Sequence, residues 1–276
     1  MTNSVHTNVA AAIALQNLSR TTENMTGVQN RISTGLKVQG AKDNAAIWAI
    51  AQGQRADIGA LSAVKQSLDR ATSIADVALS AGESISDLLN QLKEKVVAAK
   101  DLSLKTQSRE LLNADFKAIL RSIASATENA AFDGGNILNG SLSGGLRFLA
   151  NADATSFITL SGKDLTLSGS IISLGMTDEL LTLTGATDAL TRLDDSIIAL
   201  NSALGDIGAQ ARQISAHNTF VSKLTDTLES GIGNLVDADL AKESARLQSL
   251  QVQQQLGAQA LSIANQAPQI ILSLFQ

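Results

Sequence analysis

The sequence predicts a mainly α-helical fold. It consists of long antiparallel coiled-coil-like rods, a small β-hairpin region in the middle and amphipathic helices at both ends. Three observations predict this fold. The 276 residues include only one proline, so almost nothing interrupts helices. Apolar residues recur every seven positions over two long segments. Short glycine-bounded runs rich in Ile, Leu, Thr and Phe occur only between these two segments.

The first long segment, residues 45–102, is predicted to be one rod. A helix of this length spans on the order of 80 Å at about 1.5 Å per residue. That exceeds the usual globular helix of about 8–20 residues, which indicates a rod rather than a compact bundle. Asp43 or Asn44 is a suitable N-cap for it. A break near residues 102–106 precedes a shorter striped helix.

The second rod begins near Thr187 and has the most regular pattern in the chain. Its expected partner is the first rod, folded back antiparallel. Asn218 interrupts the pattern and either sets the register between the rods or faces a solvated gap. The apolar seam residues of the two rods are Leu61, Leu68, Ile85, Leu89, Leu92, Val96, Leu193, Leu200, Ile207, Ile214, Val221, Leu228 and Leu235.

The middle of the chain, residues 136–187, is predicted to form short strands or hairpins. The runs "LRFLA", "SFITLSG" and "LTLSGSIISLG" are bounded by turn-forming glycines. Ser and Thr are frequent from Ser141 to Thr187, which favours an exposed surface. These hydroxyl groups either accept O-linked sugars or simply suit short edge strands.

The two ends carry sparser apolar stripes than the rods. A first helix is expected from about Thr2 to Arg31, and the chain closes on "SIANQAPQIILSLFQ". The apolar run "IILSLF" is far shorter than the ~20 residues of a membrane-spanning helix. Either other copies of the chain or a dedicated partner is therefore expected to bury this end. The residues predicted to mediate polymerisation are Leu15, Leu18, Met25, Leu247, Leu250, Leu261, Ile271, Leu272, Leu274 and Phe275.

Composition argues against several functional classes. There is no cysteine, and the two histidines, His6 and His217, lie on different segments, so neither a metal site nor a catalytic site is expected. Acidic and basic residues are interspersed with a net charge of -5, which argues against nucleic-acid binding. Asp237 and Asp239 lack the rest of a calcium loop and are expected at a helix entry. The sequence therefore predicts no enzyme, no cofactor and no membrane insertion.

Both ends resemble bacterial flagellin. The segment "VHTNVAAAIALQNLSRTTENMTGVQNRISTGLKVQGAKDNAAIWAIA" is similar to the family's N-terminal region. The segment "NLVDADLAKESARLQSLQVQQQLGAQALSIANQAPQIILSLF" is even more similar to its C-terminal region. His6, Ile47, Leu240 and Gln276 depart from the commonest family residues. The chain looks like the short α-proteobacterial type, which lacks large outer domains.

The resemblance implies a structural subunit that self-polymerises into the flagellar filament. Such a subunit would be exported unfolded by the flagellar type III apparatus, with its terminal helices ordering on assembly. It would meet an export chaperone, the export gate, the filament cap and the hook–filament junction proteins. The implied parts are an inner-tube helix and spoke (1–44), rod helices (45–135), a surface segment (136–187), a second rod helix (188–235) and a C-terminal inner-tube helix (236–276). The alternatives are a hook–filament junction protein or a non-flagellar coiled-coil signalling or adhesion module.

Overall fold

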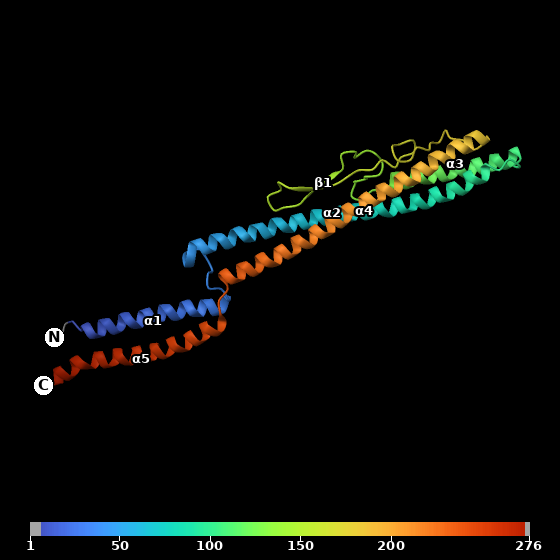
Figure 1. Ribbon diagram of the computed structural model, residues 1–276. Coiled ribbons are helices and arrows are strands. Elements are labelled where there is room, and N and C mark those ends of the chain that lie inside the picture. Colours follow the sequence, from blue (N-terminus) through green and yellow to red (C-terminus); the bar gives the residue numbers. More distant parts are fainter. Residues whose placement is uncertain (1–6, 274–276) are drawn as a thin grey trace. The chain divides into compact units, whose positions relative to one another are not determined.

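The computed structural model describes the backbone of residues 7–273 and the side chains of residues 7–266. The chain divides into two compact units (Figure 1). Unit 1 comprises the residues up to Ala56 and those from Thr227, and unit 2 is Asp57–Asp226. The described residues form five helices and one two-stranded antiparallel sheet. The predicted fold class, mainly helical with a small hairpin in the middle, is confirmed.

Unit 1 contains helices α1 (Val9–Thr34) and α5 (Leu240–Ser273), which lie side by side (Figure 1, blue and red). The Asn8 side chain caps α1 by accepting a hydrogen bond from the backbone N–H of Ala11 at 3.0 Å. Gly35 ends α1 in a left-handed conformation with φ 73°, which glycine adopts without steric cost. The predicted start of this helix near Thr2 lies outside the described residues.

Helix α2 (Ala41–Ala99) contains a break at Asn44, where φ is -159° and ψ is 101°. The Asn44 side chain accepts a hydrogen bond from the N–H of Ile47 at 3.1 Å, so Asn44 is the N-cap of the rod. Asp43 instead accepts hydrogen bonds from the N–H groups of Gln39 and Gly40 at 2.9 and 3.3 Å. Of the two candidate caps, Asn44 begins the rod and Asp43 holds the preceding turn.

In unit 2, α2 and α4 (Leu183–Val236) run antiparallel, as the heptad pattern predicts. Lys93 Nζ lies 2.7 Å from Asp194 Oδ1, and Asn218 Nδ2 donates to Asp69 Oδ1 at 2.6 Å. Residue numbers therefore rise along one helix as they fall along the other. The half-buried Asn218 contacts the other rod directly rather than facing only solvent.

Most seam residues lie in the core of unit 2. Full burial of a Leu, Ile or Val side chain contributes roughly 1.5–3 kcal/mol. Leu228 and Leu235 belong to unit 1 and are half-buried there. The seam residues of unit 2, each at most 3% exposed, are Leu61, Leu68, Ile85, Leu89, Leu92, Val96, Leu193, Leu200, Ile207, Ile214 and Val221.

Helix α3 (Thr106–Asn129) follows a tight turn and buries Phe116 and Leu120. The Arg109 guanidinium donates to the backbone carbonyls of Ala99 and Asp101, which places a cation at the carbonyl end of α2. These hydrogen bonds from Arg109 stabilise the turn between α2 and α3.

The same turn makes a pH-dependent contribution to stability. The Ser103 N–H and hydroxyl donate to the Asp101 carboxylate, and together with nearby Arg109 they lower the pKa of Asp101 below its ordinary value. A lowered folded-state pKa stabilises the fold above the unfolded pKa, and this is lost as pH falls through the folded value. We expect the Ser103 amide to exchange faster with solvent as pH falls through the lowered pKa of Asp101, after correction for intrinsic exchange. Asp101→Asn should abolish that dependence, and an unchanged profile would contradict this assignment.

The middle segment forms a single hairpin. Strands β1 (Leu146–Leu149) and β2 (Phe157–Leu160) pair antiparallel, with Leu146 opposite Leu160. The prediction of further strands in "LTLSGSIISLG" is wrong: in that part of the described chain only an isolated parallel bridge joins Leu167 and Ile172. Three apolar residues of that run are buried by packing, without the backbone ladder that a strand requires. They are Leu165, Ile172 and Leu174.

Candidate functional site

The pair of helices α1 and α5 has the properties expected of a self-association surface. Asn8 Nδ2 donates to the carbonyl of Ala264 at 2.7 Å at one end, and Arg31 lies 3.5 Å from Glu243 at the other. The two helices are therefore antiparallel. Between these contacts, a methyl group added to Gly257 would lie 3.3 Å from Leu18 Cδ1, so the absent side chain lets α1 approach closely.

Helix α5 has two apolar stripes on opposite faces. Leu250 and Leu261 lie on the face toward α1, where Leu250 is 7% exposed. Val252, Leu256 and Ile263 are spaced four and seven residues apart and share another face, where they are 55%, 59% and 69% exposed. Successive helical residues are about 100° apart, so Val252 lies about 200° from Leu250. One stripe packs within the chain and the other faces outward.

Helix α1 shows the same division near its N-terminus. Leu18 packs near α5, whereas Val9 and Ile13, four residues apart on the opposite face, are more than half exposed. Leu15 is 57% exposed but lies about 60° from Leu18, at the flank of the contact with α5. A single exposed apolar residue is ordinary on a protein surface, but apolar residues at helical spacing on both members of a helix pair indicate an interaction face. The outward stripes of α1 and α5 together are called the outer apolar faces below.

The structure assigns different positions to the residues predicted to mediate polymerisation. Leu15 is exposed, Leu250 is buried, and the other described members of the set are half-buried. The half-buried members are Leu18, Met25, Leu247 and Leu261. Ile271 and Leu272 lie on α5, but their side chains are outside the described residues, as are Leu274 and Phe275 altogether.

Sequence reasoning missed most of the outer apolar faces. The missed residues are Val9, Ile13, Val252 and Leu256, whereas Ile263 belongs to the closing stretch that another copy or a partner was expected to bury. The four- and seven-residue spacing that links Val252 and Leu256 to Ile263 was the signal that could have found these two. This spacing was obscured because α5 carries a second apolar stripe through Leu247, Leu250 and Leu261, which is also compatible with one face of a helix.

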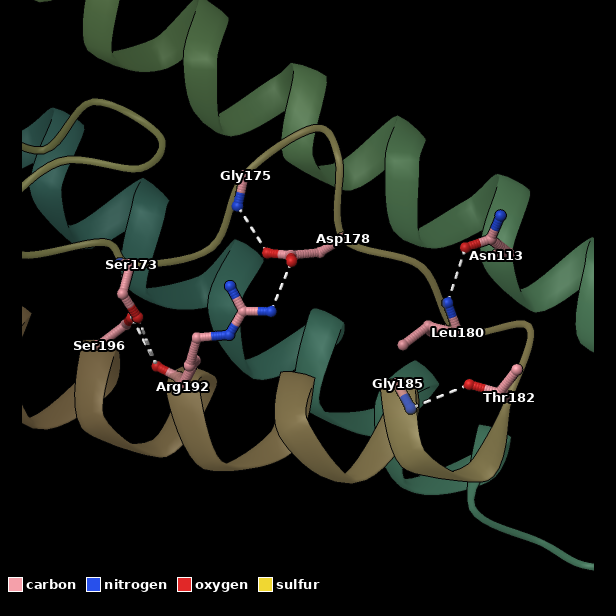
Figure 2. Close-up of polar contacts among 9 residues, drawn as sticks. All are labelled: Asn113, Ser173, Gly175, Asp178, Leu180, Thr182, Gly185, Arg192 and Ser196. Carbon is pink, nitrogen blue, oxygen red and sulfur yellow. Dashed lines mark hydrogen bonds and ion pairs between the residues drawn. The ribbon is translucent and has the colours of Figure 1, made fainter.

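The segment that precedes α4 is fastened to that helix by polar contacts (Figure 2). The Asp178 carboxylate accepts a hydrogen bond from the Gly175 N–H at 2.8 Å and forms an ion pair with Arg192 of α4. The backbone N–H of Ser173 donates to Ser196 Oγ at 3.2 Å. Asp178 is only 12% exposed, so this pair is better shielded than the exposed ion pairs elsewhere in unit 2.

The same segment also contacts α3. The Leu180 N–H donates to Asn113 Oδ1 at 2.9 Å (Figure 2), and Lys117 lies 2.8 Å from Glu179. Leu180 itself is fully buried. These contacts attach an irregular segment to two helices and leave most of its hydroxyls outside. The Ser and Thr residues from Ser141 to Thr187 are exposed, with the exceptions of Ser161 and Thr166.

The charged and imidazole side chains of the described residues were expected to have structural positions. The described residues hold no cluster of three His, Cys, Asp or Glu side chains suited to a metal ion. The His217 ring is hydrogen-bonded to the Ala150 carbonyl at 2.7 Å, whereas His6 lies outside the described residues. Asp239 accepts hydrogen bonds from the Ala241 and Lys242 N–H groups, which confirms its expected place at a helix entry. Among the described helices, none is both long enough and apolar enough to span a membrane.

Comparison with known proteins relates the whole chain to one family. Residues 5–143 match the bacterial flagellin N-terminal helical region, and residues 190–275 match the flagellin C-terminal helical region. Flagellin FljJ of Caulobacter vibrioides is 54% identical, over 100% of this chain and 99% of that protein. A flagellin of Brucella melitensis is 39% identical, over 99% of both chains.

Solved structures show related folds at lower identity. A Bacillus cereus flagellin matches with a TM-score of 0.50 at 17% identity, covering 56% of this chain and 88% of that one. A Vibrio parahaemolyticus flagellar hook-associated protein gives 0.54 at 13% identity, covering 71% and 100%. At these identities the likeness concerns the fold alone, whereas the full-length matches favour a filament subunit over a junction protein. The chain belongs to the bacterial flagellin family, the structural subunits that self-assemble into the extracellular flagellar filament.

Proposed function

We propose that the outer apolar faces are the surfaces through which copies of this chain pack in the core of the filament. The observation that carries the proposal is the α5 stripe of Val252, Leu256 and Ile263. It is more than half exposed and lies on the opposite side from the contact with α1. A stripe left outward after the intrachain pair has formed requires another molecule to bury it.

The energetic gain is sufficient to support assembly. Burying Val252, Leu256 and Ile263 contributes roughly 1.5–3 kcal/mol each, which is an upper bound of about 9 kcal/mol per copy. Val9 and Ile13 on α1 add to this in the same way, with an upper bound of about 6 kcal/mol. The interface is heterologous if the α5 stripe of one copy meets the α1 stripe of the next, and heterologous contacts that do not close generate helical filaments.

Electron microscopy of the purified chain tests this function. We expect the isolated chain, added to short filament seeds, to extend them into filaments built from this one polypeptide. A hook–filament junction protein would instead end growth after a single layer, and a coiled-coil signalling or adhesion module would not add to the seeds. Either of those outcomes would contradict the proposal.

We also propose a layered assignment of the chain, supported by the similarity of both ends to flagellins. Residues 1–44 and 236–276 form the inner tube, residues 45–135 and 188–235 form the next layer, and residues 136–187 form the outer surface.

The chain has a structural role and no enzymatic one. It leaves the cell unfolded through the flagellar type III apparatus, after contact with an export chaperone and the export gate. It is then placed beneath the filament cap, and the first copies meet the hook–filament junction proteins.

A further inference from the structure

Two linkers of unit 1 cross and pair next to the helix pair. Residues 35–38 follow α1, and residues 236–238 precede α5. Leu36 and Asp237 form an isolated antiparallel bridge between them. We call this pairing of residues 35–38 with residues 236–238 the linker clamp. The clamp joins the C-terminal end of α1 to the N-terminal end of α5, although these helices are far apart in the sequence.

The clamp is held by backbone hydrogen bonds. The N–H groups of Lys37 and Val38 both donate to the Val236 carbonyl, at 2.8 and 3.3 Å. In the opposite direction, the Ala238 N–H donates to the Gly35 carbonyl at 2.7 Å. Gly35 presents that carbonyl from a left-handed conformation with φ 73°, so a β-branched residue here would strain the crossing.

Both valines of the clamp are buried. Val38 is 7% exposed and Val236 is 2% exposed, which makes the clamp a well-packed part of unit 1. The distal end of the helix pair is less buried, because Leu261, on the face of α5 toward α1, is half-buried, whereas Leu250 on the same face is 7% exposed. Local opening is easiest where few apolar contacts are buried.

Contacts between α1 and α5 also weaken away from the clamp. Near it, Arg31 pairs with Glu243, whose side chain is only 12% exposed. Leu250, further along α5, is still buried. At the distal end, the Asn8 side chain donates a hydrogen bond to the Ala264 carbonyl, and Ala264 itself is only half-buried. The gradient of burial and contact runs in one direction along the pair.

We infer that the linker clamp is the nucleus from which α1 and α5 close together as each copy joins a filament. This inference rests on the proposed function, because it concerns the order of events during assembly. Bringing two distant segments together carries a loop-closure cost, and helix formation has a costly first turn. Once the clamp has formed, each further turn of α1 meets α5 at high effective concentration. The pair therefore closes from Arg31–Glu243 toward Asn8–Ala264.

Seeded filament elongation with matched variants tests the order of closure. We expect Gly35→Val to slow elongation about tenfold or more, because strain at the clamp raises the barrier to closure. Gly35→Asn is the matched control, since Asn tolerates the left-handed conformation, and it should elongate within about twofold of the wild type. Asn8→Ala removes the distal contact and the α1 cap. It should leave the elongation rate within about twofold while raising the rate of subunit loss several-fold.

Hydrogen exchange of the wild-type filament provides a second readout that needs no variant. The amides of Lys37, Val38 and Ala238 should exchange more slowly than those in the first turns of α1. If Asn8→Ala slows elongation as much as Gly35→Val, or if the clamp amides exchange faster than the α1 start, the inference is wrong. Failure of the proposed function would appear differently, as normal elongation by variants of the outer apolar faces.

Discussion

Leu256→Asp is expected to abolish filament growth while leaving unit 2 folded and the α1-facing side of α5 unchanged. Leu256 is 59% exposed and lies on the face of α5 that points away from α1, so the substitution disturbs no intrachain packing. In the filament, it would remove the burial of a leucine and place a carboxylate in an apolar contact. We expect a loss of about 3 kcal/mol or more per contact, which raises the critical concentration for assembly on the order of 10²-fold.

The measurement is the critical concentration from seeded assembly, with helicity followed by circular dichroism. Leu256→Met is the matched control, because it keeps the apolar volume and should assemble within about threefold of the wild type. Leu250→Asp should act differently, since Leu250 lies on the face of α5 toward α1 and its loss weakens the intrachain pair rather than the contact between copies. Normal filaments from Leu256→Asp would rule out the outer face of α5 as an interface.

The second large effect is expected on stability. Leu200 is fully buried in the seam between α2 and α4, and Leu200→Ala should lower the free energy of unfolding by about 2–5 kcal/mol. The control lies two residues away on the same helix. Ile198 is 69% exposed, so Ile198→Ala should change the free energy of unfolding by no more than about 0.5 kcal/mol.

Urea unfolding of the monomer, followed by circular dichroism at 222 nm, measures both variants. Because Ala has a higher helix propensity than Ile, Ile198→Ala is expected to be neutral or slightly stabilising. Equal destabilisation by the two substitutions would show that the seam between the rods does not carry the stability of unit 2.

The rods could be predicted from the sequence because their signal is repeated many times. A heptad pattern that returns from Leu193 to Val221 survives an interruption such as Asn218. The pairing of the two rods with each other could also be predicted, since both have the same seven-residue period. Between Asp43 and Asn44, however, residue type alone does not decide the cap: both accept backbone hydrogen bonds, and they differ only in which turn they bind.

The middle segment was harder to predict because its contacts follow no period. Asn136 donates to the Thr127 carbonyl and accepts from the Leu138 N–H, so one buried side chain shapes the chain after α3. The Asp178–Arg192 pair and the Asn113–Leu180 bond act in the same manner. In this segment, side-chain hydrogen bonds and ion pairs hold the backbone in place of the strand-to-strand hydrogen bonds that the composition predicted.

The candidate site was only partly predictable for a different reason. The apolar residues of α5 indicated that this helix must be buried by other elements. They did not indicate which of these residues pack against α1 within the chain and which meet another molecule. Leu250 and Leu256 are equivalent in type and spacing, and only the position of α1 distinguishes them. The residues free to meet another copy are those that remain exposed after the pair has formed.

An electron cryomicroscopy map of the filament formed by this chain would test the central claim most directly. The account predicts that Val252, Leu256 and Ile263, each more than half exposed in the single chain, become buried against α1 or α5 of neighbouring copies. The outward residues Val9 and Ile13 of α1 should become buried with them. A map in which the Val252–Ile263 stripe still faces solvent, while other surfaces hold the copies together, would contradict the account.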